Sequence, residues 1–261
     1  MNATHSDPVS DFSRLSLSEA TLGNLSQLGY ANMTPIQAAS LPLTLAGRDL
    51  IAQASTGSGK TAAFGLPLVE KLQATRMAVQ ALVLCPTREL ADQVTQEIRR
   101  LARAVSNIKV VTLCGGVALR GQVMSLEHGA HVVVGTPGRV MDLMQQGALR
   151  LAGVQYVVLD EADRMLDMGF EPQIRQVVAK LPVDTRQTML FSATWPKEIQ
   201  QLAREFLRNP VEVKYGEADT LNANKAITQR ILVVPESQKR ETLKTILAEL
   251  NPGGKPEGMP K

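Results

Sequence analysis

The chain has 261 residues, of which 44% are hydrophobic and 20% are charged, and this composition excludes a disordered tail protein, a collagen and a coiled coil. Its formal net charge of +3 excludes a protein that coats nucleic acid through bulk charge, so any nucleic-acid contact is expected to be local. Aromatic residues make up only 3% of the chain, which argues against a stacking platform for single strands.

The predicted elements begin after a polar tail at residues 1–11. Between residues 12 and 215, short β-rich runs alternate with helical patterns, and several runs are apolar on both faces, as in a covered parallel sheet. This alternation predicts an α/β doubly wound domain with helices on both faces, whose ligands bind at the carboxyl ends of the strands. The expected strands are residues 50–52, 81–85, 110–114, 132–135, 154–160, 188–191 and 211–213.

The last part of the chain has a different pattern. Residues 216–226 are polar and indicate a linker, and they are followed by an expected strand at 227–234, an expected helix at 237–250 and a Pro- and Gly-rich, disordered tail at 251–261. A single strand and helix cannot bury an apolar stripe alone. We therefore expect residues 227–250 to be frayed, docked on the first domain, or self-associated with another copy of the chain.

Two further features bear on the compartment. Cys85 and Cys114 lie inside apolar runs and indicate buried thiols rather than a disulfide. The N-terminus lacks a basic segment followed by an apolar one, and no apolar run reaches the ~18 residues of a membrane span. We therefore expect a cytoplasmic protein with no membrane partner.

The strongest motif is a candidate phosphate-binding loop at residues 54–61, which follows an expected strand and precedes a helical pattern. Its glycines allow backbone N–H groups to converge on phosphate oxygens at a helix N-terminus. Lys60 is placed to reach the β- and γ-phosphates, and the Thr61 hydroxyl is placed to bind Mg²⁺. The general pattern has glycine where this chain has Ala54, and a Gly/Ser-rich loop without a ligand is the alternative. The expected nucleotide contacts are Ser55, Thr56, Gly57, Ser58, Gly59, Lys60 and Thr61.

A second nucleotide-binding feature is the carboxylate pair Asp160 and Glu161 at the end of an expected strand. Asp160 is placed to hold Mg²⁺ through water, while Glu161 is placed to orient and activate the attacking water. Alternatively, the pair is an ordinary solvated helix start, where acidic residues interact favourably with the helix dipole. Together with the phosphate loop, the pair predicts an ATP site whose catalytic residues are Lys60, Asp160 and Glu161.

Residues 160–163 read Asp-Glu-Ala-Asp, and with the phosphate loop they make the chain resemble a DEAD-box RNA helicase. Further motifs of this family occur in the family's order over residues 12–215. The resemblance implies a RecA-like domain at 12–215 that binds ATP, Mg²⁺ and RNA and couples ATP hydrolysis to local unwinding of RNA duplexes. It also implies that residues 227–250 are the first strand and helix of a second RecA-like domain.

Residues 29–30 and 34–37, with Phe12 upstream, resemble the adenine-reading motif of the family. The resemblance implies that Phe12, Tyr30 and Gln37 bind the base. The Gln37 amide can both donate to and accept from an adenine edge, and Tyr30 offers a ring on which a base can stack. The alternatives are a core aromatic residue at Tyr30 and a helix-surface amide at Gln37.

Three more segments resemble the RNA-binding motifs of the family, which implies contacts to the RNA backbone that carry no sequence information. Thr87 and Thr136 are expected where helices begin, so N–H groups there can bind phosphates, and Arg88 and Arg139 add positive charge. Arg88 is alternatively a structural ion-pair partner. The implied RNA-binding residues are Pro86, Thr87, Arg88, Gly115, Gly116, Thr136, Pro137, Gly138 and Arg139.

One further segment resembles the motif that couples the two ligands in this family. It contains Ser192 and Thr194. The resemblance implies that these hydroxyls bond toward Asp163 and relay the state of the nucleotide to RNA binding.

The family's motor has two RecA-like domains, and this sequence contains only the first in full. The missing domain is an expected partner of this chain. Its arginines can increase the rate of ATP hydrolysis by a factor of ~10³–10⁵, so we expect this chain alone to hydrolyse little ATP. The amino-acid sequence between the motifs resembles that of bacterial members that act on ribosomal RNA, which implies a role in ribosome assembly. One alternative is a shortened, non-catalytic RNA- or protein-interaction module. Another is a DNA-directed relative, but the adenine motif and residues 160–163 argue against it.

Overall fold

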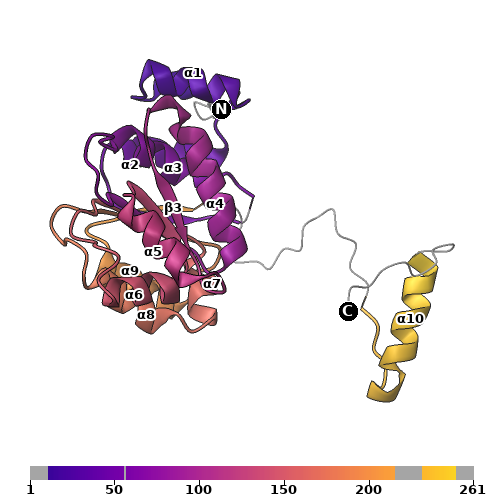
Figure 1. Cartoon of the computed structure of the whole chain (residues 1–261). Coiled ribbons are helices and arrows are strands. Elements are labelled where there is room, and N and C mark those ends of the chain that lie inside the picture. Colours follow the sequence, from indigo (N-terminus) through magenta and orange to yellow (C-terminus); the bar gives the residue numbers. More distant parts are fainter. Residues whose placement is uncertain (1–10, 56, 215–230, 251–261) are drawn as a thin grey trace, which may run out of the picture. The chain divides into compact units, whose positions relative to one another are not determined.

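The computed structural model describes residues 11–55, 57–214 and 231–250. The chain divides into two compact units, Met1–Asp219 and Thr220–Lys261, so the division falls within the expected linker (Figure 1). The linker itself and the expected tail at 251–261 lie outside the described residues. In the part of the chain that is described, none of the helices is both long enough and apolar enough to cross a membrane.

The first unit is built around one sheet of seven strands, all of them parallel. The strands are β1 (Leu50–Gln53), β2 (Ala81–Leu84), β3 (Val110–Leu113), β4 (Val132–Gly135), β5 (Tyr156–Leu159), β6 (Gln187–Ser192) and β7 (Val211–Lys214). Their order across the sheet is β3-β4-β2-β5-β6-β1-β7. All seven expected strands are confirmed, with ends that differ by up to two residues.

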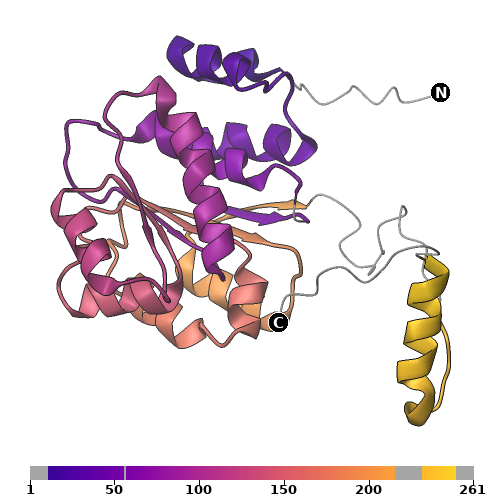
Figure 2. The same cartoon turned by 45° about the vertical axis from the view of Figure 1, so that its right-hand side comes forward.

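Helices cover both faces of this sheet, as Figures 1 and 2 show from two directions. On the side of one face lie α1 (Glu19–Gln27), α2 (Pro35–Leu45), α3 (Lys60–Lys71) and α4 (Arg88–Leu101). On the other lie α5 (Leu119–Glu127), α6 (Pro137–Gln145), α7 (Ala162–Asp167), α8 (Glu171–Val178) and α9 (Lys197–Phe206). Short 3₁₀ helices occupy Phe12–Arg14 and Ala102–Ala104. The arrangement confirms the RecA-like doubly wound α/β fold.

The two helical layers explain why the strands are apolar on both faces. Val83 in β2 belongs to the core that contains Phe64 of α3, whereas its neighbours Leu82 and Leu84 belong to the core that contains Ile174 of α8. Successive side chains of a strand point to opposite faces of the sheet. Every residue of such a strand is therefore buried, and the alternation of apolar and polar residues that marks a half-exposed strand is absent.

The second unit contains α10 (Lys239–Leu250), preceded by a 3₁₀ turn at Glu236–Gln238. The helix confirms the sequence prediction to within two residues. The predicted strand is not found at residues 231–234, and residues 227–230 lie outside the described part of the chain. Ile231 and Val233 are 87% and 97% exposed. A strand is stabilised by its pairing with neighbours, and none of the described residues pairs with this segment.

Candidate active site

The loops that carry the predicted phosphate-binding, acidic and RNA-binding residues follow the carboxyl ends of parallel strands, whereas Phe12, Tyr30 and Gln37 precede the first strand. The phosphate loop follows β1 and the acidic pair follows β5, and β6 alone separates these strands in the sheet. The predicted RNA-binding loops follow β2, β3 and β4, which are consecutive at the other side of β5. The sheet order thus divides one edge into a nucleotide half and a nucleic-acid half, in agreement with where doubly wound folds bind ligands.

A cavity of about 910 Å³ lies at the nucleotide half of this edge. From the predicted set it is lined by Tyr30, Gln37, Gly57, Gly59, Lys60, Thr61, Thr87, Asp160 and Glu161. Ser55 and Ser58 are not among the lining residues, and Thr56 lies outside the described residues. Phe12 is buried and does not line the cavity either, so its predicted contact with the base is not supported.

The phosphate loop has the backbone that its glycines predict. Gly57 and Gly59 have φ angles of 77° and 95°, in the left-handed region that side chains disfavour. A β-carbon at Gly59 would lie 2.6 Å from Nε2 of Gln37, so glycine is required there for space as well. Lys60 opens α3 immediately afterwards, and its buried ammonium donates to the carbonyl of Ala54 at 3.2 Å. Loop and helix end therefore form one cradle with a cation at its base.

Gln37 links the predicted adenine motif to this loop. Its Oε1 accepts from the N–H of Thr34 at 2.9 Å, and its Nε2 donates to the carbonyl of Gly59 at 3.1 Å. The side chain is buried, so the alternative of a helix-surface amide is wrong. One amide hydrogen and one lone pair remain for a ligand. The predicted contact of Gln37 with adenine stays a prediction.

Asp160 is a buried carboxylate with an unused oxygen. Its Oδ1 has no hydrogen-bond partner among the described residues. Burial raises the pKa of Asp160 to about 6, against the opposing influence of the Lys60 ammonium. The unpartnered carboxylate oxygen of Asp160 and the hydroxyl of Thr61 line the same cavity, and oxygen donors of this kind are what Mg²⁺ prefers. The residues present therefore fit the expected magnesium ion.

Glu161 combines backbone strain with burial. Its φ angle of 51° is left-handed, an arrangement that costs a non-glycine residue about 1–3 kcal/mol. Its carboxylate faces the cavity, where Oε2 lies 3.4 Å from Nη1 of Arg164. It is therefore not the solvated helix start of the alternative interpretation. Strain of this kind persists where the surrounding structure holds a residue in place, which agrees with a site residue.

Asp163, two residues further on, is fully bonded instead. Its Oδ2 accepts from the N–H groups of Ala193 and Thr194 and from the hydroxyl of Thr194, at 3.1, 2.9 and 2.9 Å. The expected bond between Thr194 and Asp163 is thus present. Ser192 differs from the expectation, because its hydroxyl donates to the carbonyl of Thr194 at 2.9 Å. It shapes the loop after β6 rather than contacting the carboxylate.

The predicted RNA-binding residues line the other half of the edge. Thr87 caps α4, with its hydroxyl accepting from the N–H of Leu90 at 3.3 Å. Arg88 pairs with Asp92 at 3.7 Å, as the alternative interpretation proposed, but both side chains are about half exposed and the pair is weak. Arg139 donates to the carbonyl of Val117 at 3.1 Å.

Small residues keep this half of the edge open. No atom lies within 4 Å of a β-carbon placed at Gly115, Gly116 or Gly138, so a ligand backbone has room to approach. Pro86 and Pro137 are buried and offer no side-chain surface. The open glycines and the half-exposed side chain of Arg88, rather than the prolines, are therefore accessible parts of the predicted set.

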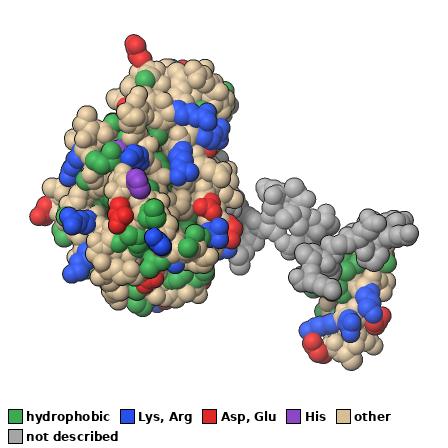
Figure 3. All heavy atoms as spheres, in the orientation of Figure 1, with side chains coloured by type: hydrophobic (Ala, Val, Ile, Leu, Met, Phe, Trp, Pro, Cys, Tyr) green, Lys and Arg blue, Asp and Glu red, His purple; other side chains and the backbone are tan. Residues whose placement is uncertain are grey.

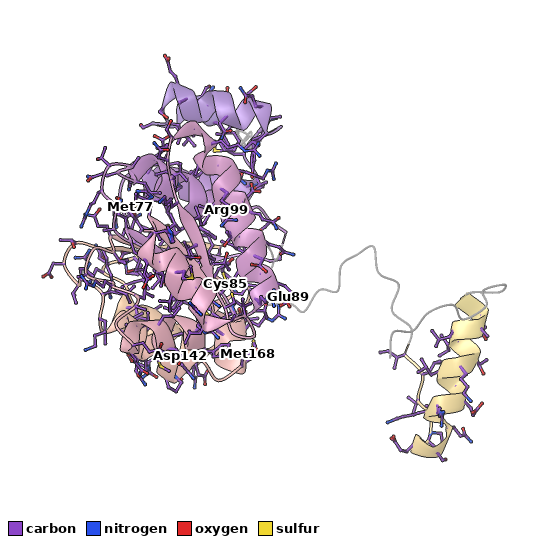
Figure 4. The ribbon with its side chains drawn as sticks, viewed as in Figure 1. Met77, Cys85, Glu89, Arg99, Asp142 and Met168 are labelled. Atoms are coloured by element: carbon purple, nitrogen blue, oxygen red, sulfur yellow. The ribbon has the colours of Figure 1, made fainter. Side chains whose placement is uncertain are left out.

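One wall of the cavity is formed by residues that were not predicted from the sequence. Helix α4 contributes a stripe that includes Gln93, Glu97 and Arg100, spaced by four and three residues. In Figure 4 the labelled Glu89 and Arg99 mark the first and last turns of this helix. The helical spacing of these polar residues is visible in the sequence, but nothing local indicates that they face a nucleotide cavity.

The chain is similar to several known proteins. The family model described as DEAD/DEAH box helicase matches residues 34–202. The ATP-dependent RNA helicase DbpA of Escherichia coli (strain K12) is 52% identical over 205 residues, which cover 78% of this chain and 45% of that protein. The DEAD-box ATP-dependent RNA helicase 14 of Arabidopsis thaliana is 44% identical over 252 residues, which cover 95% of this chain and 40% of that protein.

A solved structure gives the same picture. The crystal structure of a DEAD box protein from the hyperthermophile Methanococcus jannaschii matches with a TM-score of 0.75 and 38% identity, covering 91% of this chain and 63% of that one. Both the fold and the sequence similarity therefore extend over most of this chain. The chain spans about half the length of the curated relatives it matches.

Proposed function

Because the chain belongs to the DEAD/DEAH box helicase family, we propose that it is the ATP- and RNA-binding part of an ATP-dependent RNA helicase. The observation that carries the proposal is the division of one sheet edge. The phosphate loop and the acidic pair share a single cavity, and open glycine loops follow the neighbouring strands. Such an arrangement suits an enzyme that binds a nucleotide and a nucleic-acid backbone side by side.

The roles within the cavity follow from chemistry. The backbone of residues 57–59 and the ammonium of Lys60 bind the phosphates, and Thr61 and Asp160 would hold Mg²⁺. When bound, the ion neutralises charge on the phosphates. Glu161 orients and activates the attacking water. Support comes from the unpartnered oxygen of Asp160 and the strained position of Glu161, both in the cavity.

RNA binding is proposed at the glycine loops and the starts of α4 and α6. Thr87 and Thr136 precede these helices, and the adjoining arginines Arg88 and Arg139 carry positive charge. On the face shown in Figure 3, Lys and Arg side chains are interspersed with acidic and hydrophobic ones rather than gathered in one patch. This supports binding by a few placed groups to the RNA backbone, without sequence readout. We further propose coupling through the bond between Thr194 and Asp163.

The second unit is proposed to be the beginning of a second RecA-like domain. Its described residues expose apolar side chains at Ile231, Val233, Leu243 and Leu247. Exposed apolar groups of this kind are normally covered by further protein. We propose that the rest of such a domain would cover them, with self-association of the chain as the competing outcome, and that full unwinding activity requires the second domain.

Two finer proposals complete the function. Ribosomal RNA is the proposed substrate. This is supported because the amino-acid sequence between the motifs resembles that of bacterial family members that act on ribosomal RNA. A cytoplasmic location is supported by Cys85 and Cys114, which are buried and unpaired, as in a reducing compartment. A shift of the chain into ribosome-sized fractions of a cell lysate would test the ribosomal RNA proposal.

The main proposal is tested by titrating the chain with a fluorescent ATP analogue and Mg²⁺, with and without single-stranded RNA. Lys60→Ala is expected to weaken nucleotide binding about tenfold or more, because it removes the buried cation of the loop. Glu161→Gln is expected to bind nucleotide like the parent but to lose turnover when a second RecA-like domain is supplied in trans. Parent-like nucleotide binding by Lys60→Ala would contradict the proposal.

Two control measurements separate the alternatives. Partner binding that ignores ATP and is unchanged in both variants would indicate a non-catalytic module. Competition between RNA and DNA strands of one sequence distinguishes an RNA-directed enzyme from a DNA-directed one, and preferential loss of the RNA signal to a DNA competitor would contradict the RNA assignment.

A further inference from the structure

A chain of hydrogen bonds connects the wall formed by α4 to the ring of Tyr30. The Tyr30 hydroxyl donates a short hydrogen bond to Oε1 of Glu97, and Oε2 of Glu97 accepts from Nη1 of Arg100 at 2.7 Å. All three residues line the nucleotide cavity. Glu97 is therefore bonded through both carboxylate oxygens, on one side to a ring that faces the cavity and on the other to a compensating charge.

The ring of Tyr30 is held from two directions. It packs against Phe12 in a T-shaped contact, with ring centroids 6.0 Å apart and planes at 86°. Its hydroxyl is held by Glu97. Burial, together with this hydrogen bond, raises the pKa of the Tyr30 phenol well above its ordinary value, so the hydroxyl stays protonated and remains a donor. Phe12 packs against the ring, and Glu97 holds its hydroxyl end.

The anchor of Glu97 is itself rigid. Glu97 lies in the interior of α4, and the side chain of Asn24 in α1 donates to the carbonyls of Arg100 and Leu101 at the end of that helix, at 3.0 and 2.9 Å. A ring fixed by a rigid element loses less freedom when a planar ligand stacks on it, and preorganisation of this kind contributes to affinity.

We propose that Glu97 is a positioning residue for the base-binding wall, which holds the ring of Tyr30 through its hydroxyl and is held in turn by Arg100. The inference rests on the proposed nucleotide function and deepens it. It assigns Glu97 to recognition of the planar base and not of the phosphates. Removal of its carboxylate should then weaken ligands that carry a base and leave bare polyphosphate binding unchanged.

The test is a double-mutant cycle on the 261-residue chain. Dissociation constants for Mg²⁺–ATP and for Mg²⁺–tripolyphosphate are measured for the parent, Tyr30→Phe, Glu97→Ala, Glu97→Gln and the double variant Tyr30→Phe, Glu97→Ala. Glu97→Ala and Tyr30→Phe are each expected to weaken ATP about 3- to 10-fold, because each removes the same hydrogen bond. The double variant is expected to match either single one, since the second change has nothing further to remove.

Glu97→Gln separates positioning from charge. It keeps an acceptor for the Tyr30 hydroxyl while losing the negative charge, so it is expected to restore ATP affinity to within about 2-fold of the parent. Unchanged tripolyphosphate affinity in all variants is expected as well. If Glu97→Ala does not fold, the comparison of Tyr30→Phe with Glu97→Gln still decides, because only Tyr30→Phe should lose affinity.

Three results would overturn the inference. These are equal losses for ATP and tripolyphosphate in Glu97→Ala, an additive double variant, or a Glu97→Gln variant as weak as Glu97→Ala. Failure of the proposed function looks different, because then the parent would bind neither ligand and Lys60→Ala would change nothing. Parent-like ATP binding by Glu97→Ala beside a weakened Lys60→Ala would reject the role of Glu97 alone.

Discussion

Asp160 makes the folded protein less stable at neutral pH than it would be with a neutral residue at this position. Burial raises the pKa of this carboxyl from an ordinary 3.8 to about 6. A carboxyl whose pKa is higher in the folded chain than in the unfolded chain favours folding while it is protonated. That contribution is complete below about pH 4 and is lost as the pH rises through about 6. At pH 8 the folded chain holds this carboxyl in its charged form, which is poorly solvated at a buried position and therefore lowers the stability of the fold.

The size of the effect follows from the same values. The difference between 3.8 and about 6 corresponds to about 3 kcal/mol of unfolding free energy at pH 8. Asp160→Asn removes the free-energy cost of the buried charge with little change in the shape of the side chain. The value of about 6 already includes the attraction between the Asp160 carboxylate and the Lys60 ammonium, so the loss of that attraction is contained in the figure of about 3 kcal/mol. We therefore expect Asp160→Asn to be more stable than the parent by about 1–3 kcal/mol at pH 8.

Urea unfolding at pH 8 and at pH 4.5, without nucleotide or Mg²⁺, measures this prediction. Trp195 is the single tryptophan of the chain and lies in the first unit, so its fluorescence reports the unit that holds Asp160. Because other titrating groups are common to both proteins, the difference between variant and parent isolates Asp160. The gain should be largest at pH 8 and about a third as large at pH 4.5.

Asp163→Asn is the matched control. Asp163 is fully bonded, with Oδ2 accepting from Ala193 and Thr194 and Oδ1 from the N–H of Arg164. An amide in its place turns one acceptor into a donor that faces N–H groups, so this variant should lose about 1–3 kcal/mol at pH 8. A less stable Asp160→Asn at pH 8, or a gain of the same size at pH 4.5, would refute the reasoning from burial.

Three other substitutions have expected outcomes. Gly59→Ala should abolish ATP-analogue binding and destabilise the chain by about 1 kcal/mol or more. The reason is that the φ angle of this residue is 95° and the new β-carbon would lie 2.6 Å from Nε2 of Gln37. Intact binding in a titration would contradict this. Gln122→Leu removes the bonds to both backbone groups of Cys114 and should cost about 2–4 kcal/mol, with faster exchange of the Cys114 amide. Unchanged exchange would argue against it. His131→Leu should cost about 2–4 kcal/mol in urea unfolding, since both ring nitrogens of this buried residue contact backbone groups; a cost below 1 kcal/mol would show that these contacts are dispensable.

The sequence predicted those features whose signals are local. The seven strands are short apolar runs bounded by helical patterns, and the phosphate loop is a continuous segment with glycines at its left-handed positions. The order of the strands was not predicted, because alternation indicates a parallel sheet but does not state which strands are neighbours. That order is what places β5 near β1 and so brings Asp160 to the phosphate loop.

Contacts between distant residues could not be predicted. Tyr30 and Glu97 are 67 positions apart, and only the packing of α4 brings them together. The predicted bond from Ser192 to Asp163 was wrong for a related reason, since the turn after β6 directs the hydroxyl of Ser192 to the carbonyl of Thr194. The expected strand at 227–234 was wrong for its described residues, 231–234, because an apolar pattern specifies a strand only where a neighbouring strand is available.

The ligand that the site is proposed to bind should offset the loss of folding stability that the buried charge of Asp160 causes. A group that binds only the folded chain stabilises it by about 2.7 kcal/mol at 100 times its dissociation constant. The Asp160→Asn variant has lost a proposed magnesium ligand, so its gain from Mg²⁺–ATP should be far smaller. The order of stability should therefore reverse, with the variant more stable without ligand and the parent more stable at saturating Mg²⁺–ATP. Thermal unfolding of both proteins across a ligand titration measures the reversal, and parallel curves that never cross would show that the oxygen of Asp160 is not used by the ligand.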